Sequence, residues 1–136
     1  MKERRDSDEH YVIDLCDRVL GMKAERQYNK FPFLRGDTGR PLAVDAFYPE
    51  LKLVIEYHER QHSEAVKFFD RRMTPSGCLR GEQRRRYDDR RRVGIPRNGY
   101  RLLVIDWRVF GPRRRLRRDA VAHEEIVRSL LAPFIQ

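Results

Sequence analysis

"VDAFYPELKLVIEYHERQH", residues 44–62, decides the fold. Two apolar runs, residues 42–48 and 51–57, flank a Pro-Glu dipeptide, which is typical of two antiparallel strands joined by a tight hairpin. Each run carries one acid among apolar neighbours, Asp45 in the first and Glu56 in the second. Pairing the runs about the turn places these acids at nearly opposite positions, where Cβ atoms lie about 5 Å apart.

Two carboxylates at that separation repel each other. Keeping either one ionised among apolar residues costs on the order of several kcal/mol unless a cation or hydrogen-bond donors meet it. A few hard oxygen ligands, with water completing the shell, suit Mg²⁺, and we expect Mn²⁺ to substitute. We therefore expect Asp45 and Glu56 to be metal ligands. The alternative is that each acid lies at a strand end and simply reaches solvent or an arginine.

Two histidines follow the second acid within six residues, His58 and His62. A histidine beside a metal-bound phosphate can activate water or protonate the leaving oxygen. Either one alone is more often a surface residue. Next to two acids and a basic flank, at least one is expected to take part in chemistry.

The remaining elements follow from hydrophobic periodicity and from turn residues. The strand near the C-terminus lacks alternation, so we expect it to be covered on both faces, and Tyr87 and Val93 are expected to face inward from a basic helix. The order of elements predicts one α/β (α+β) domain over residues 1–136, with a mixed sheet of about four strands flanked by helices and a flexible tail at 1–6. Helices are expected at 7–21, 63–71, 82–92 and 118–131, and further strands at 27–34 and 98–107.

The net charge of +9 is concentrated in the second half of the chain. Between Asp70 and Arg118 there are 17 Arg and no Lys against five acids. Codon bias can replace Lys by Arg but does not explain an excess over acids, so the field predicts a nucleic-acid surface. Trp107 is expected to pack in the core rather than to wedge between bases. The expected phosphate contacts are Arg84, Arg85, Arg86, Arg90, Arg91, Arg92, Arg113, Arg114 and Arg115.

Composition excludes several classes of protein. The two cysteines, Cys16 and Cys78, form no CxxC pair and cannot hold zinc alone. There is no apolar run of about 18 residues, and MKERRDSDEH lacks the apolar stretch of a signal peptide. We therefore expect a reduced, cytoplasmic protein with no membrane partner.

Two stretches carry a resemblance to a known family. "VDAFYPELKLVIEYHERQH" and "RRRYDDRRRVGIPRNGYRLLVIDW" resemble the core of the very short patch repair (Vsr)-like endonucleases, a branch of the PD-(D/E)xK, restriction-endonuclease-like superfamily. Asp45, Glu56 and His62 match the family's strand Asp, its apolar strand ending in "IE", and its His six residues later. The family's basic helix carries an acid that matches Asp88, with Asp89 as a near rival.

The family also carries a Glu in a helix near its N-terminus. Glu9 occupies the comparable place, and Glu25 is the second choice. Glu9 also has the spacing of a capping box with Asp6, in which case it closes the helix start and nothing more. His58 stands where a standard PD-(D/E)xK enzyme has Lys, so either His58 or His62 takes over that task.

The resemblance implies Mg²⁺-dependent hydrolysis of a DNA phosphodiester, in restriction, repair or homing. It implies that Asp45 holds the metal, joined by Glu56 or a backbone carbonyl beside it, and that His62 acts as general base or acid. Asp88 and Glu9 would then orient His62 or hold metal-bound waters. One site per chain cuts one strand, so a nick, a homodimer or a targeting partner protein is expected. The alternatives are an inactive nucleic-acid-binding module of the same fold, or a nuclease for RNA, branched or modified DNA.

Overall fold

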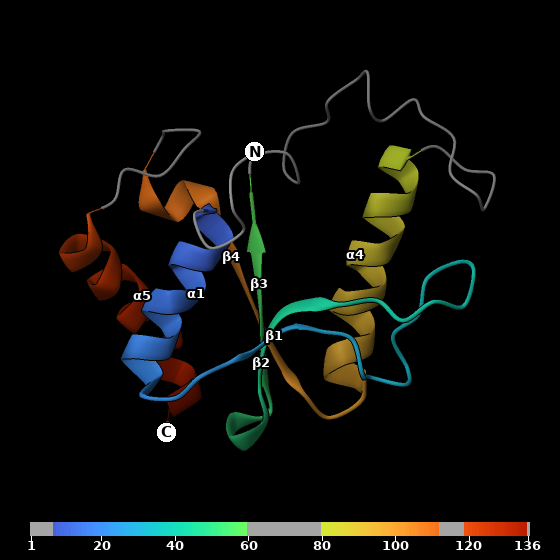
Figure 1. Ribbon diagram of the computed structural model, residues 1–136, viewed down its shortest axis with the longest axis horizontal. Coiled ribbons are helices and arrows are strands. Elements are labelled where there is room, and N and C mark those ends of the chain that lie inside the picture. The colour runs from blue at the N-terminus through green and yellow to red at the C-terminus, as the bar shows by residue number, and fades with distance from the viewer. Residues whose placement is uncertain (1–6, 60–79, 112–118, 136) are drawn as a thin grey trace.

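A computed structural model describes residues 7–59, 80–111 and 119–135. The chain forms a four-stranded sheet with helices on both faces (Figure 1). The strand order is β1-β2-β3-β4, with the first two pairings antiparallel and the last parallel, so the expected mixed α/β sheet is confirmed. The helices and strands are α1 (Asp8–Leu20), β1 (Glu25–Tyr28), β2 (Val44–Tyr48), β3 (Leu53–His58), α4 (Arg80–Arg97), β4 (Arg101–Asp106) and α5 (Ala120–Ile135).

Helix α1 begins and ends where its capping residues dictate. The Ser7 hydroxyl accepts a hydrogen bond from the His10 backbone N–H at 3.1 Å, and Gly21 ends the helix in the left-handed conformation with φ 68°. Its apolar stripe packs on the sheet together with α5, on the left of Figure 1. The buried residues of this face are Val12, Ile13, Leu15, Cys16, Ala46, Tyr48, Leu53, Ile55, Tyr57, Ile105, Trp107, Val127 and Leu131.

Helix α4 covers the opposite face of the sheet (Figure 1). Here the core is rich in aromatic rings, and the segment between β1 and β2 contributes much of it. Trp107 is 7% exposed and belongs to the α1 and α5 face, so its expected core position is confirmed. The buried residues of the α4 face are Phe31, Leu34, Leu42, Val44, Phe47, Val54 and Ile95.

The strand expected at 27–34 is wrong beyond its first residues. Strand β1 ends at Tyr28, and no regular element covers 29–34. Phe31 and Leu34 are buried because the segment folds under α4, where Phe31 packs edge-on against Phe47. The loose alternation of apolar residues therefore reflects loop packing and not a sheet.

The hairpin turn is longer than a Pro-Glu dipeptide. Pro49–Leu51 form a single turn of 3-10 helix, and Lys52 follows in the left-handed conformation with φ 49°. The Lys52 backbone N–H donates to the Pro49 carbonyl oxygen at 3.1 Å. Proline is favoured at the first position of a helical turn because its φ is already fixed there.

Two expectations about α4 and β4 need correction. Helix α4 continues to Arg97 because Ile95, in its last turn, is fully buried, whereas Val93 is 51% exposed and does not face inward. Strand β4 lies at the edge of the sheet, so Val104 is 41% exposed and the strand is not covered on both faces. Among the described residues, no helix is long and apolar enough to cross a membrane.

Candidate active site

Asp45 and Glu56 meet where the β2–β3 ladder ends. The ladder registers Tyr48 with Leu53 and runs to the pair Ala46 with Ile55. The next pair in the same register would be Asp45 with Glu56, and the hydrogen bonds between their strands agree with the expected near opposition of the two acids. Successive side chains of a strand point to opposite faces of the sheet. Ile55 and Tyr57 pack on the α1 and α5 face, so Glu56 lies on the α4 face.

Beyond the last pair of the ladder, the two carboxylates accept hydrogen bonds from backbone N–H groups in place of backbone carbonyls. The Asp45 backbone N–H donates to Glu56 Oε2 at 2.6 Å, and the Tyr57 backbone N–H donates to Asp45 Oδ2 at 2.7 Å. Each acid therefore accepts a donor from the strand of the other. These charge-assisted bonds hold both side chains in defined positions at the point where β2 and β3 separate.

Burial disfavours the ionisation of both carboxyl groups at once. Glu56 is only 7% exposed, and its burial, followed by the charge of Asp45, raises its pKa to about 8. Burial also raises the pKa of Asp45, against the opposing effects of the Tyr57 N–H and of Arg91. A buried acid beside another acid prefers the neutral form unless a cation is close.

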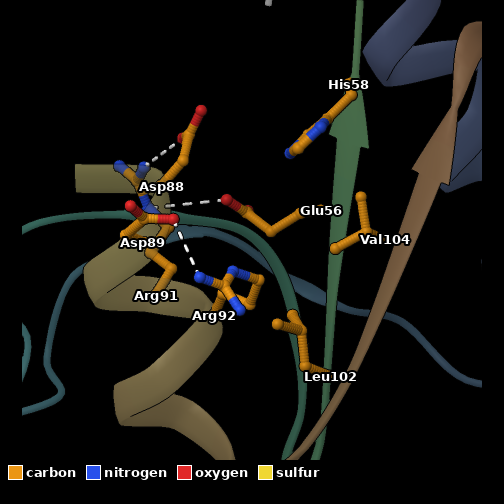
Figure 2. Close-up of a pocket in the computed structure, with 8 residues that line it drawn as sticks. All are labelled: Glu56, His58, Asp88, Asp89, Arg91, Arg92, Leu102 and Val104. Atoms are coloured by element: carbon orange, nitrogen blue, oxygen red, sulfur yellow. Dashed lines mark hydrogen bonds and ion pairs between the residues drawn. The ribbon is translucent and has the colours of Figure 1, made fainter. Parts of the chain in front are cut away.

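Arg91 brings positive charge from α4 to the pair (Figure 2). Its side chain is 18% exposed and its Nε lies 3.4 Å from Glu56 Oε1. The same Nε donates to the Ala43 carbonyl oxygen at 3.0 Å, and Nη1 donates to Asp88 Oδ1 at 3.0 Å. Arg91, which the sequence predicts as a phosphate contact, therefore faces the acids.

Glu9 and Gln27 approach Asp45 from α1 and β1. Gln27 Nε2 donates to Glu9 Oε2 at 2.8 Å, and the hydrogen-bonding influence of both side chains lowers the pKa of Asp45 against the larger effect of its burial. Helix α1 is capped by Ser7, which leaves the Glu9 carboxyl for the site. Glu25, the second choice, is exposed and registers with Phe47.

Gln27 was not identified from the sequence. It falls between the registered pairs Arg26–Ala46 and Tyr28–Val44, which puts it across from Asp45, and its φ is 50°. A residue other than glycine in this conformation inside a strand costs about 1–3 kcal/mol and often marks a functional position. The only signal in the sequence was a polar residue opposite the strand acid, and the register needed to read it was not available.

His58 lies two residues beyond Glu56 and projects toward the same side of β3 (Figure 2). It lines a pocket of about 180 Å³ between β3, β4 and α4. Asp88 reaches the pocket paired with Arg91, whereas Asp89 is 66% exposed and pairs with Arg92. The pocket is lined by Glu56, His58, Asp88, Asp89, Arg91, Arg92, Leu102 and Val104.

The arginines of α4 do not form one uniform face. Arg86 and Arg90 both pair with Asp37, at 3.0 Å and 2.6 Å, and Asp37 is 10% exposed in its side chain. Arg92 is 68% exposed. Arg85 is also exposed, and Arg84 is partly buried. His62, Arg113, Arg114 and Arg115 lie outside the described residues.

Within the described part of the chain, no group of three or more His, Cys, Asp or Glu is arranged to hold a metal ion. The arrangement nevertheless offers carboxylate oxygens from Asp45 and Glu56 in a buried setting. Adding positive charge there would relieve the repulsion that raises the pKa of Glu56. The donor set is therefore chemically suited to a hard divalent cation, with water and neighbouring oxygens completing its shell.

Comparison with known proteins gives little more. No family model matches the chain, and no solved structure matches it. The chain is similar to uncharacterized protein 094L of Frog virus 3 (isolate Goorha), with 31% identity over 96 residues. The aligned region covers 71% of this chain and 59% of the viral protein, so the chain spans less than two thirds of that relative.

Proposed function

We propose that the chain is a Mg²⁺-dependent endonuclease that hydrolyses DNA phosphodiesters, of the Vsr-like type with a restriction-endonuclease-like fold. One observation carries this proposal: Asp45, partly buried, and Glu56, buried, face each other at the end of the β2–β3 ladder, each bound to the other's strand. Each acid accepts a backbone N–H and Glu56 has Arg91 nearby, yet the charge of each carboxylate still opposes that of the other. Such a pair is costly unless a cation is shared.

The topology supports the same proposal. An antiparallel hairpin carries both acids, and a helical crossover through α4 returns the chain to a strand parallel to β3. The acids lie near the end of β3 beside the N-terminal part of α1 and the basic helix α4. A substrate strand that reaches the acids therefore passes the arginines of α4, which favours a polyanion.

Asp45 and Glu56 would hold Mg²⁺, which when bound polarises the scissile phosphate and acidifies a water. The chain's own residues do the rest. Gln27 and Glu9 fix the direction of the Asp45 carboxyl, and the Tyr57 N–H holds its second oxygen. His58, which lines the pocket, would accept or deliver a proton there, and His62 is the second candidate for this step.

Phosphate contacts would come from the exposed arginines of α4, with Arg85 and Arg92 on the open surface. Arg86 and Arg90 are partly neutralised by Asp37, so they contribute less to the field. Contacts of this kind carry no sequence information. The recognised sequence and the choice between nicking and double-strand cleavage therefore have to come from other residues or from a partner.

A supercoiled-plasmid assay tests the proposal. The wild-type chain should convert the plasmid to nicked or linear forms with Mg²⁺ or Mn²⁺ and not with EDTA, and the Asp45→Asn variant should leave it intact. A panel of single-stranded, branched and modified DNA and of RNA then ranks the substrates. Binding of plasmid without cleavage under all metal conditions would contradict the nuclease and support a binding module of the same fold.

A further inference from the structure

Arg91 makes three polar contacts of unequal quality. Its bonds to Ala43 O and Asp88 Oδ1 are both 3.0 Å, whereas its Nε lies 3.4 Å from Glu56 Oε1. Charge-assisted hydrogen bonds between guanidinium and carboxylate normally measure about 2.7–2.9 Å. The guanidinium is thus anchored by the first two partners and only loosely by Glu56.

The position of Arg91 also differs from that of its neighbour on α4. Arg91 is 18% exposed and lies against a carboxylate that is 9% exposed in its side chain, so their attraction is poorly screened. Arg92 carries the same charge, lines the same pocket and pairs with Asp89, but both partners are about two-thirds exposed, at 68% and 66%. The two residues therefore form a natural matched pair.

A divalent cation bound to Glu56 would lie close to the guanidinium, whose Nε is 3.4 Å from Glu56 Oε1, and two cations that close repel each other. This inference rests on the proposed function. We propose that Arg91 is the built-in counter-ion of Glu56, which Mg²⁺ must displace, and that the displaced guanidinium stays beside the ion to bind an oxygen of the scissile phosphate. The anchors on Ala43 and Asp88 keep it in the site after Glu56 is released. Arg91 thus weakens cation binding and strengthens phosphate binding.

Titration calorimetry with Mn²⁺ on the folded protein, without nucleic acid, tests the first half. The Arg91→Gln variant should bind Mn²⁺ about fivefold or more tightly than wild type, within the usual range of coupling between sites. The Arg92→Gln variant removes the same charge one residue along and should change the affinity by less than about twofold, because exposed charges are screened. At saturating Mn²⁺, cleavage by Arg91→Gln should fall about 10- to 100-fold.

Affinity that is unchanged or weaker in Arg91→Gln, in a preparation whose wild type binds Mn²⁺ and cleaves DNA, would overturn the inference and leave the nuclease standing. A wild type that binds no Mn²⁺ and cuts nothing would overturn the proposed function itself. If Arg91→Gln fails to fold, NMR of the wild-type protein tests whether Mg²⁺ displaces the guanidinium. The Arg91 Nε–H signal, assigned by its loss in Arg91→Lys, should shift saturably with Mg²⁺, and a signal that stays fixed at saturation contradicts the displacement.

Discussion

Asp17 and Glu56 are two acids in largely buried surroundings with opposite kinds of company. The Asp17 carboxylate accepts from the Tyr48 hydroxyl at 2.6 Å, from the Ala24 N–H at 3.0 Å and from Arg26 Nη2 at 2.8 Å. Glu56 accepts one backbone N–H, has Arg91 at 3.4 Å and faces a second acid, Asp45.

Asp17 is an acid whose charge stabilises the fold, whereas the charge of Glu56 is unfavourable in the folded protein. Asp17 ties α1 to β1 and β2 through three donors, so its charge is balanced within the protein. The charge of Glu56 is opposed by its burial and by Asp45, which is why its pKa rises to about 8. Acids of the second kind concentrate at functional sites.

The same substitution in each cluster should give opposite results, and the larger effect is on cleavage. Asp45→Asn keeps an oxygen for the Tyr57 N–H but removes the charge that a metal needs. Cleavage should fall about 10²- to 10⁴-fold, since metal stabilisation of the transition state is worth several kcal/mol. Urea unfolding should show no loss of stability, because repulsion with Glu56 is relieved. Cleavage within about threefold of wild type would remove Asp45 from the mechanism.

Asp17→Asn should show the reverse. Loss of the charge leaves Arg26 with Asp14 as its remaining acid partner and weakens the bond from the Tyr48 hydroxyl. We expect unfolding in urea to become easier by about 3 kcal/mol, as when one partner of a partly buried pair is removed. Cleavage per folded molecule should stay close to wild type. A variant that keeps its stability but loses cleavage would show that the two clusters are not separate.

Gln27 and Lys52 allow a further test, because both have positive φ, at 50° and 49°. Glycine at either position relieves backbone strain, which is worth about 1 kcal/mol before the entropy of glycine is counted. Only Gln27→Gly also removes the bridge between Glu9 and Asp45. Cleavage should fall about 10- to 100-fold in Gln27→Gly and stay unchanged in Lys52→Gly. Equal activity in the two variants would reduce Gln27 to a structural role.

The smallest expected effect is a pH dependence of stability in metal-free buffer. The folded pKa of Glu56, about 8, exceeds its ordinary value of 4.5, so the folded protein keeps a proton that the unfolded chain loses between these values. The free energy of unfolding contributed by Glu56 therefore falls as pH rises through this window. Glu56→Gln, which does not titrate, should gain on wild type steadily between pH 5 and pH 8.5, by at most about 1.4 kcal/mol per pH unit.

Thermal unfolding at several pH values measures that gain. Mg²⁺ should then stabilise wild type at pH 8.5 and leave Glu56→Gln unaffected, because a ligand stabilises only the state that binds it. A difference between the two proteins that stays constant with pH would mean that Glu56 titrates near its ordinary value.

The sequence was sufficient for elements with strong local signals. The helical spacing that begins at Ser7 and the glycine at position 21 predicted α1. The two apolar runs predicted the hairpin, but a Pro-Glu turn would set Asp45 opposite Val54, and the observed turn over residues 49–52 shifts the register by two and sets it opposite Glu56. The mixed sheet followed from the order of elements.

The rest depended on tertiary contacts that leave no local trace. Helix α4 is polar on nearly every face, and among its residues only Gly81 and Ile95 are buried, so no periodicity could show that Arg91 turns inward while Val93 turns out. The exposure of Val104 follows from β4 lying at the sheet edge. The role of Gln27 depends on an unusual φ, which sequence patterns do not encode.

Titration of the folded wild-type protein with Mg²⁺ or Mn²⁺ in a calorimeter measures whether Asp45 and Glu56 bind a cation together. We expect saturable uptake of a divalent cation that strengthens as pH rises toward 8 and that disappears in Asp45→Asn. Uptake that is absent from wild type, or that survives unchanged in Asp45→Asn, would contradict a cation shared by Asp45 and Glu56.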